Sequence, residues 1–484
     1  MKLTSTYNVR LAKDINVCLD DTIAIYRKAV DFYIGVMLNE WDETFAYVMN
    51  GNASVKYAEA LTVSTDRHPS PKYDFGKDFY KFPCYLRRSA IAEAYGSVKS
   101  HKSNLTNWLN EPVGKRGRRP SEPKAGYTYP CLYSGNCYTR TGLRSARIKV
   151  FIRNTWDWVD VNFRNTDAKY IERRCKNMAE CSPTLIKKGK NWELSFPFKE
   201  DVKLVTTPLS ERKIAAVDLG IRNACTISVM KSDGAVIGRR FLSLPIENDC
   251  LRQALSRIKK AQRSGAKRKP RLWAKANGIN RHIAEKTAQF IIEACCLYDV
   301  DVVVMEALSL KGKKRGSKRQ RLSLWKAKYV QKLVGHKAHL LGMRVSYVCP
   351  NGTSKLAFDG SGEVLRGKDS ERCHNNYSLC EFSNGKLYNC DLNASYNIGS
   401  RYYIREILGE MTERSRLSVS AKVPSLIQRS TCTLSTLYDL HAAVNGVPLM
   451  RSECIMSEET KDSDAIQRQP TRTVGNRMHA TSVV

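Results

Sequence analysis

The segment "KIAAVDLGIRN" (213–223) constrains the fold most, because a short apolar run in it ends on a single carboxylate, Asp218. An apolar run of this length is typical of a buried strand. A buried strand gains nothing from an unpaired charge, which is costly to remove from water. Either Asp218 and Gly220 begin an ordinary turn, in which both residue types are common, or Asp218 has a function that other parts of the chain complete.

Two further acids follow similar segments. Glu306 ends the largely apolar run 299–306, and Asp391 begins a helical pattern in "CDLNASYN". Taken separately, Glu306 is consistent with a surface acid at a strand end, and Asp391 with a helix N-cap, a position that Asp favours. If the strands that end at Asp218 and Glu306 are neighbours, their carboxylates lie at one edge of a sheet, and the helix brings Asp391 over that edge.

Three carboxylates in one place repel each other unless cations neutralise them. Hard oxygen ligands of this kind select Mg²⁺ or Mn²⁺. Two such ions about 4 Å apart can clamp the attacking water and the leaving oxygen of a phosphodiester. The sequence therefore predicts that Asp218, Glu306 and Asp391 are both the metal ligands and the catalytic residues of a phosphodiester-cleaving site.

The order of elements around these acids predicts the fold of the C-terminal half. Three short strands between 213 and 242 have short links, which favour antiparallel pairing. A helical stretch, a strand, a helix, a strand and a helix follow, which predicts a ribonuclease-H-like α/β domain with a mixed sheet covered by helices. In the N-terminal half, an opening strand, two helical segments and alternating strands over 145–200 predict a small β-barrel or sheet that holds a helical insert. The whole chain is expected to be a multidomain α+β protein.

Composition favours a nucleic-acid partner. The chain has 80 Lys and Arg residues against 47 Asp and Glu, a formal net charge of +33, and a 42% hydrophobic content that argues against a disordered basic tail. Such a charge repels itself unless a polyanion compensates for it. A ribosome-associated or generally adhesive protein is the alternative.

The cellular location is expected to be the reducing cytoplasm. The first residues lack the apolar region of a signal peptide. No apolar run approaches the roughly 20 residues of a membrane span, so no membrane partner is expected. The 16 cysteines are scattered along the chain, and most are expected to be free thiols.

Basic runs without acids lie on both sides of the predicted site. Residues 251–281 contain eleven Lys and Arg, residues 311–332 contain ten, and "GKRGRR" (114–119) adds a third cluster. One such run is usually a solvated face, but runs that bracket a metal site are predicted to contact phosphates. The predicted contact residues are Lys115, Arg116, Arg118, Arg119, Lys259, Lys260, Arg263, Lys267, Arg268, Lys269, Arg271, Lys311, Lys313, Lys314, Arg315, Lys318, Arg319 and Arg321.

The acidic segments resemble the split RuvC nuclease motifs of transposon-encoded TnpB proteins and compact type V CRISPR effectors. The motifs here are "AAVDLGIRNACTIS", "VVVMEALSL" and "YNCDLNASYNI", and "CPNGTSK" (349–355) resembles the segment before the zinc finger. The likeness covers residues 211–400 by motif and the N-terminal half only by layout. It implies a prokaryotic RNA-guided DNA endonuclease in which Asp218, Glu306 and Asp391 bind two Mg²⁺ ions, which Mn²⁺ can replace.

The resemblance also implies a division into domains. The expected ranges are a β-barrel wedge domain at 1–12 and 126–210, a helical recognition insert at 13–125, a RuvC-like nuclease domain at 211–348 and 391–450, a degenerate zinc-finger-like target-loading insert at 349–390, and a tail at 451–484. The tail has few core-forming residues and is expected to be disordered.

The chain departs from the family in the expected zinc finger. Relatives usually have two CxxC pairs there, but "LAFDGSGEV" (356–364) stands where the first pair would be. Cys373, His374, Cys380 and Cys390 remain, at irregular spacing. Either they form a weak zinc set, or the segment is a metal-free loop held by packing and hydrogen bonds.

The expected activity follows from the resemblance. The protein would bind a structured guide RNA of transposon or CRISPR origin, recognise a short motif on double-stranded target DNA, form an RNA–DNA heteroduplex and cleave DNA at a single two-metal site. One alternative is an RNA-independent nuclease or resolvase with the ribonuclease H fold. The other is a non-cleaving RNA-guided DNA-binding regulator.

Overall fold

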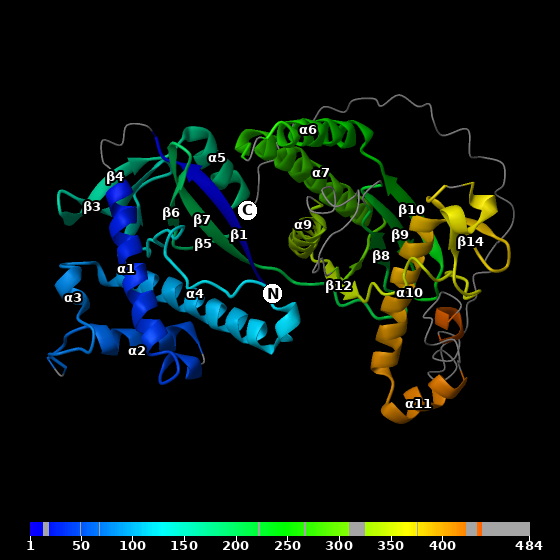
Figure 1. Ribbon diagram of the computed structural model, residues 1–484, viewed down its shortest axis with the longest axis horizontal. Helices are drawn as coiled ribbons and strands as arrows, with labels where there is room; N and C mark the ends of the chain where they lie inside the picture. The colour runs from blue at the N-terminus through cyan, green and yellow to red at the C-terminus, as the bar shows by residue number, and fades with distance from the viewer. Residues whose placement is uncertain are drawn as a thin grey trace. The chain divides into compact units, whose positions relative to one another are not determined.

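The computed structural model describes residues 1–12, 19–48, 50–66, 68–220, 223–265, 268–308, 325–374, 376–422 and 433–437. Two compact units divide the chain, an N-terminal unit, Lys2–Asp201, and a C-terminal unit that begins at Val202. The sequence predicts this boundary later, at residue 210. The chain is multidomain and contains both helices and sheets (Figure 1).

The N-terminal unit combines two antiparallel sheets with a group of helices. Its strands are β1 (Lys2–Arg10), β2 (Tyr138–Arg140), β3 (Ser145–Ile152), β4 (Thr155–Asn162), β5 (Ala179–Glu180), β6 (Thr184–Lys188) and β7 (Asn191–Asp201). Its helices are α1 (Leu19–Asn39), α2 (Gly51–Thr62), α3 (Phe75–Asp78), α4 (Cys84–Asn110) and α5 (Asn165–Arg174). Strand β7 pairs with β1, β5 and β6, while β3 pairs with β2 and β4. A bridge between Leu11 and Phe163 links the described strands of the two sheets, and the closed barrel remains a prediction.

A single apolar core holds this unit together. It joins residues of α1 and α4 to the inner residues of both sheets, with Tyr26, Tyr33 and Phe196 among the largest buried side chains. Helices α1, α2 and α4, inserted in sequence between β1 and β2, therefore share their core with the strands that flank them.

The C-terminal unit is built on a five-stranded sheet in the order β10-β9-β8-β11-β12. The strands are β8 (Ile214–Asp218), β9 (Cys225–Met230), β10 (Val236–Leu242), β11 (Val302–Glu306) and β12 (Arg344–Val348). Strands β8, β9 and β10 pair antiparallel, while β11 pairs in parallel with both β8 and β12. The pairing of the first and fourth strands confirms the neighbour relation on which the site prediction depends.

The apolar runs of β8 and β11 are explained by burial on both faces. Successive side chains of a strand point to opposite faces of the sheet. Ala215 and Val217 enter the core on one face, and Ile214 and Ala216 enter the core on the other. The residues of β11 divide between the two cores in the same alternating way.

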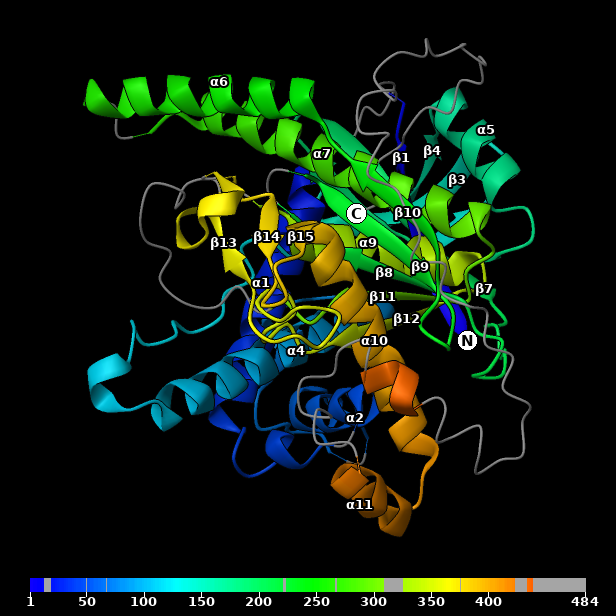
Figure 2. The same cartoon turned by 90° about the vertical axis from the view of Figure 1, so that its right-hand side faces the viewer.

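Helices cover both faces of this sheet. Helices α7 (Pro270–Leu297) and α9 (Ala327–Leu340) fill the core on one face, and α10 (Cys390–Glu410) fills the core on the other (Figure 1). Helix α6 (Pro245–Arg263) packs along α7, so that the two form a long hairpin (Figure 2). Helix α11 (Glu413–Lys422) follows α10.

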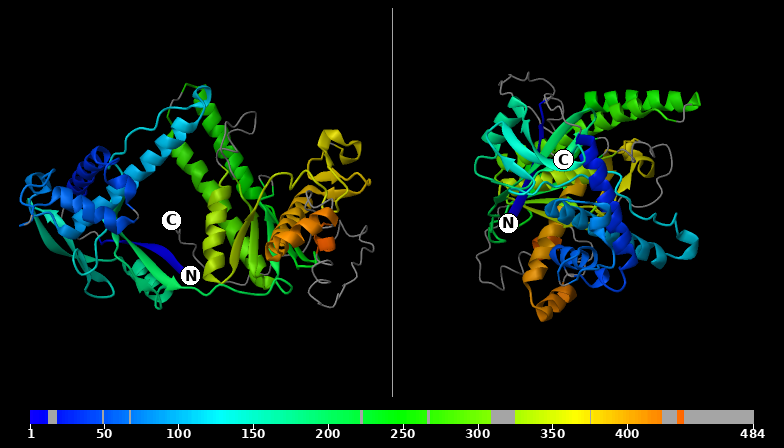
Figure 3. Two further views of the ribbon diagram at one scale, coloured as in Figure 1. Left: turned by 90° about the horizontal axis from the view of Figure 1, so that it is seen from below. Right: turned by 90° about the vertical axis from the view of Figure 1, so that its left-hand side faces the viewer.

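A small three-stranded sheet precedes α10. It consists of β13 (Leu365–Arg366), β14 (Leu379–Glu381) and β15 (Leu387–Asn389), and it has a core of its own around Phe382 and Cys380. The strand β15 leads directly into α10, which places this sheet beside the first turn of the helix (Figure 3).

Candidate active site

Asp218 and Glu306 occupy the same edge of the five-stranded sheet. Each is the last residue of its strand, and Val217 and Met305 pair directly in the parallel ladder between β8 and β11. Both carboxylates therefore follow the carboxyl ends of adjacent parallel strands, the edge at which open α/β sheets bind ligands.

Asp391 reaches this edge from the first turn of α10. The N-cap of the helix is Asn389, whose side chain accepts hydrogen bonds from the backbone nitrogens of Asp391 and Leu392. Because Asn389 caps the helix, the capping interpretation of Asp391 is wrong. The carboxylate of Asp391 is instead free to face the sheet edge, where it accepts a hydrogen bond from Asn223 Nδ2 at 2.7 Å.

The three acids interact electrostatically. Burial, followed by the charges of Glu306 and Asp391, raises the pKa of Asp218 to about 8, while the positive charge of Arg366 opposes the shift. Burial also raises the pKa of Glu306. An ordinary turn at Asp218 does not require two further carboxylates nearby. The acid cluster therefore favours the interpretation that Asp218 has a function.

Glycine is required beside the first acid. A Cβ atom at Gly220 would lie 2.4 Å from the backbone oxygen of Asn223. This contact is too short for any side chain, so Gly220 allows the chain to turn closely next to Asp218 and to bring Asn223 back toward Asp391.

Two neutral donors hold Glu306. Thr353 Oγ1 donates to Glu306 Oε1 at 2.6 Å, and Gln331 Nε2 donates to the backbone oxygen of Glu306 at 2.7 Å. Thr353 is 2% exposed, and its backbone oxygen accepts a hydrogen bond from Asn397 of α10. Such secondary contacts orient ligands in metal sites.

Sequence reasoning missed these positioning residues. Asn223 lies inside the first acidic motif and Thr353 inside "CPNGTSK", so both were within quoted segments. Neither segment has the hydrophobic periodicity of a helix or a strand at these positions. Only the folded chain shows which acid each residue contacts.

Arg366 of β13 is a further residue that the sequence did not single out. Among the described residues, its Nε and Nη2 atoms are buried and have no hydrogen-bond partner. Its charge acts on Asp218 and on the thiols of Cys380 and Cys390. Arg366 is therefore a largely buried source of positive charge within electrostatic range of Asp218.

The donor set at this edge fits a hard divalent cation in its chemistry. All three acids offer carboxylate oxygens, which are the ligands that hard divalent cations prefer. In the part of the chain that the structure describes, no three His, Cys, Asp or Glu side chains form a ready-made metal-binding group. The acids thus lie within electrostatic range of one another without forming a closed ligand set.

The predicted zinc residues are only partly gathered. Cys373, Cys380 and Cys390 are buried, while His374 is exposed. Cys380 contacts Cys390, and this contact raises the pKa of Cys380 and lowers that of Cys390. Over the described ranges these four residues do not converge as a ligand group.

The predicted phosphate contacts fall into three groups. Lys115, Arg118 and Arg119 are exposed in the N-terminal unit, where Arg116 instead donates to the backbone oxygens of Leu109 and Glu111. The exposed members in the C-terminal unit are Lys259, Lys260, Arg263, Arg268, Lys269 and Arg271. The remaining residues lie outside the described residues; they are Lys267, Lys311, Lys313, Lys314, Arg315, Lys318, Arg319 and Arg321.

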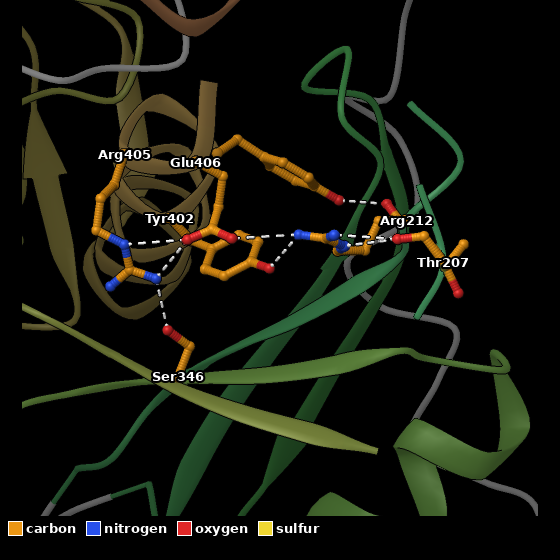
Figure 4. Close-up of polar contacts among 7 residues, drawn as sticks. Thr207, Arg212, Ser346, Tyr402, Arg405 and Glu406 are labelled. Carbon is orange, nitrogen blue, oxygen red and sulfur yellow. Dashed lines mark hydrogen bonds and ion pairs between the residues drawn. The ribbon is translucent and has the colours of Figure 1, made fainter. Parts of the chain in front are cut away.

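A polar network fixes α10 to the opposite end of the sheet. Arg212, just before β8, donates to Tyr402 at 2.9 Å and pairs with Glu406 at 3.2 Å, while it also donates to the backbone oxygen of Thr207 (Figure 4). Arg405 extends the network to Ser346 of β12. The helix that carries Asp391 is thus tied to the strand that carries Asp218.

Comparison with known proteins gives a family match and several relatives. The model of the Aq_aa04 family matches residues 4–152. The uncharacterized protein aq_aa04 of Aquifex aeolicus is 34% identical over 127 residues, which cover 24% of this chain and 71% of that protein. The TnpB-like protein aq_aa05 of the same organism is 28% identical over 273 residues, 50% of this chain and 85% of that protein.

A solved structure shares the fold. The Cas12f1 chain in a cryo-EM structure of the Cas12f1–sgRNA–target DNA complex aligns with a TM-score of 0.51 at 14% identity, over 79% of this chain and 83% of that one. The fold and the relatives define a TnpB-like protein similar to compact type V effectors. Within that class, the chain belongs to the Aq_aa04 family.

The helices give no indication of a membrane span. Over the ranges that the structure describes, none is both long enough and apolar enough to cross a bilayer.

Proposed function

We propose that this protein is an RNA-guided DNA endonuclease that hydrolyses phosphodiesters at a single RuvC-like site. One observation carries the proposal: β8, β11 and α10 bring Asp218, Glu306 and Asp391 within electrostatic range at one edge of the sheet. Relatives named TnpB-like and the fold shared with an sgRNA-bound and DNA-bound Cas12f1 support the guided reaction.

Asp218, Glu306 and Asp391 would hold two Mg²⁺ ions, or Mn²⁺ in their place. When bound, such ions neutralise the acids, activate the attacking water and stabilise the leaving oxygen. Thr353 orients Glu306, and Asn223 orients Asp391, through the hydrogen bonds described above. Arg366 contributes positive charge that offsets the negative charge of Asp218 and of a bound phosphate.

The basic segments bind the nucleic acids. The exposed cations of α6 and of the turn after it contact phosphates, as do Lys115, Arg118 and Arg119 of the N-terminal unit. The protein supports the guide RNA and the RNA–DNA heteroduplex through shape and charge, while base pairing selects the double-stranded target. The segment 349–390 leads the substrate strand to the acids, next to which it lies.

The test is cleavage of a target plasmid by protein purified together with its RNA. Asp218→Ala should abolish cutting in Mg²⁺ and leave RNA and target binding intact. Asp299→Asn is the control, because it removes a carboxylate of the same unit that is 96% exposed, and Asn tolerates the positive φ of Asp299. Cleavage by the Asp218→Ala protein would refute the site.

Two outcomes of this experiment would favour a different function. Cutting that persists after the RNA is removed would favour an unguided nuclease or resolvase. Guided binding without cutting by the unaltered protein, in Mg²⁺ and in Mn²⁺, would favour a DNA-binding regulator.

A further inference from the structure

The N-terminal unit contains a cavity of about 530 Å³ that lies between α5, β1 and the turn after β2. Its floor is apolar and buried, with Val9, Phe198 and Ile171 each at most 9% exposed. This size lies within the roughly 300–1,000 Å³ range of small-ligand pockets, which combine an apolar lining with a few placed polar groups.

A rigid guanidinium forms one wall of the cavity. Arg140 donates from Nε and Nη2 to Glu180, at 3.0 and 2.8 Å, and Glu180 also accepts a hydrogen bond from Tyr138. Arg140 Nη1 contacts the backbone oxygen of Leu143 at 3.5 Å. These contacts fix the plane of the guanidinium before any ligand binds.

Two aromatic rings lie next to this guanidinium. Its central carbon lies 5.4 Å from the centroid of Phe163 and 5.1 Å from that of Phe196. Phe163 also lines the cavity, so Arg140 and Phe163 form one wall of it together. The Arg140 side chain is 30% exposed.

The rim of the cavity carries positive charge. Arg173 and Lys176, at the end of α5 and just after it, are exposed and line the opening. Glu172 is the exposed acid of the rim, while Glu180 is neutralised by Arg140. A flat cation above an apolar floor, with further cations at the mouth, suits one base and its flanking phosphates.

We propose that this cavity takes up one unstacked nucleobase of the bound RNA. Proteins that recognise RNA commonly stack splayed-out bases on aromatic rings or Arg guanidinium planes. Here the base packs against the cavity wall that Arg140 and Phe163 form, above the apolar floor, and its polar edge faces the mouth. Arg173 and Lys176 contact the adjoining phosphates, and Glu172 accepts hydrogen bonds from an amino group of the base. The inference rests on the proposed binding of RNA and identifies where one nucleotide is held.

The experiment blocks the mouth of the cavity without disturbing the core. Leu143 lines the opening and is 43% exposed, so Leu143→Trp fills the space from the surface. The control is Leu297→Trp, at a leucine that is 63% exposed in the other unit. Affinity is measured by filter binding with a pool of short single-stranded RNAs of mixed sequence and with the matching DNA pool, at fixed salt.

Leu143→Trp is expected to weaken RNA binding about tenfold, which corresponds to the loss of one stacked base. The RNA affinity of Leu297→Trp should stay within about twofold of that of the unaltered protein. A second pair tests the rim: Lys176→Gln should weaken binding about threefold, and Lys169→Gln, an exposed lysine of α5 outside the cavity, should not. Crosslinks from 4-thiouridine in the RNA should map to the peptides that contain Leu143 or Ile171.

Equal RNA affinity of the Leu143→Trp and unaltered proteins would overturn the inference and leave the proposed function standing. A loss of affinity for the DNA pool alone would overturn it too, because the occupant would then be a DNA strand. Failure of the unaltered protein to bind any RNA would refute the proposed function and this inference together.

Discussion

At the scale of single residues, the half-buried carboxylate of Asp218 dominates the site. A carboxylate at the end of a fully buried strand costs stability when it ionises, and here two neighbouring acids add to that cost. The protein retains this unfavourable group in the centre of its sheet edge. Strain of this kind is typical of a site that gains a cation during function.

Replacing Asp218 with Asn should stabilise the cation-free protein at alkaline pH. The folded-state pKa of Asp218 is raised to about 8, so the folded protein binds this proton more tightly than the unfolded chain does. The stability that comes from protonated Asp218 is therefore complete below pH 4 and is lost as the pH rises toward 8. At pH 9 in EDTA, we expect the free energy of unfolding of Asp218→Asn to exceed that of the unaltered protein by roughly 3 kcal/mol, given about 1.4 kcal/mol per pKa unit and some relaxation.

Urea unfolding at pH 5 and pH 9 checks this result. The difference between the two proteins should shrink at pH 5 and should also shrink at pH 9 when Mg²⁺ is added. Parallel pH profiles for the two proteins would show that Asp218 is not the destabilising group.

Much of the site could be read from the sequence, and the reason is physical. Asp218 and Glu306 interrupt apolar runs that must be buried, so their position at strand ends follows from the pattern. The hydrogen bond from Thr353 to Glu306 joins residues 47 positions apart, and that from Asn223 to Asp391 joins residues 168 positions apart. No local period encodes such contacts, and the unpaired state of Arg366 becomes visible only after burial.

At the scale of elements, α10 is the part that completes the site. It packs across the sheet, caps its own first turn with Asn389, and is anchored at its far end by Arg212 and Glu406. The side chains of this pair are 11% and 27% exposed, so the pair lies largely out of water. Removing one partner of such a pair leaves the other charge poorly solvated.

Arg212→Met is expected to destabilise the C-terminal unit by about 2–4 kcal/mol, because the variant loses the Glu406 pair and the hydrogen bonds to Tyr402 and Thr207. The double variant Arg212→Met with Glu406→Gln should lose less than the sum of the single variants. Thermal unfolding of the three proteins measures this coupling.

Arg252→Met provides the control for this cycle. Arg252 pairs with Asp249 within α6, and the two side chains are 76% and 61% exposed, so the effect of the substitution should stay within about 0.5 kcal/mol. Additive effects of the Arg212 and Glu406 substitutions would contradict the anchoring role of the pair.

At the scale of the whole molecule, the two relevant features are the net charge and the order in which the strands pair. The formal net charge of +33 is spread over both units, and the basic residues of α6 form one exposed part of it. Sequence composition predicted this property directly, since charge depends only on residue counts. The arrangement of β5 and β6 on β7 was not predicted, because pairing between distant short strands leaves little local pattern.

Neutralising Lys259, Lys260 and Arg263 together, as Gln, should weaken RNA or DNA binding evenly across sequences. Each lost phosphate contact removes about 0.7–0.9 from the slope of log affinity against log salt, so the slope should fall by about 2–3. Filter binding over a series of salt concentrations measures the slope. An unchanged slope would show that this face of α6 does not contact phosphates.

The order of the elements along the chain also has a consequence for biosynthesis. Translation proceeds from the N-terminus, so the N-terminal unit and the hairpin of α6 and α7 emerge from the ribosome before α10 does. In the proposed nuclease, surfaces that bind nucleic acid therefore exist before the third acid has been made. If the proposed function holds, a half-synthesised chain would therefore bind RNA before it could cut DNA.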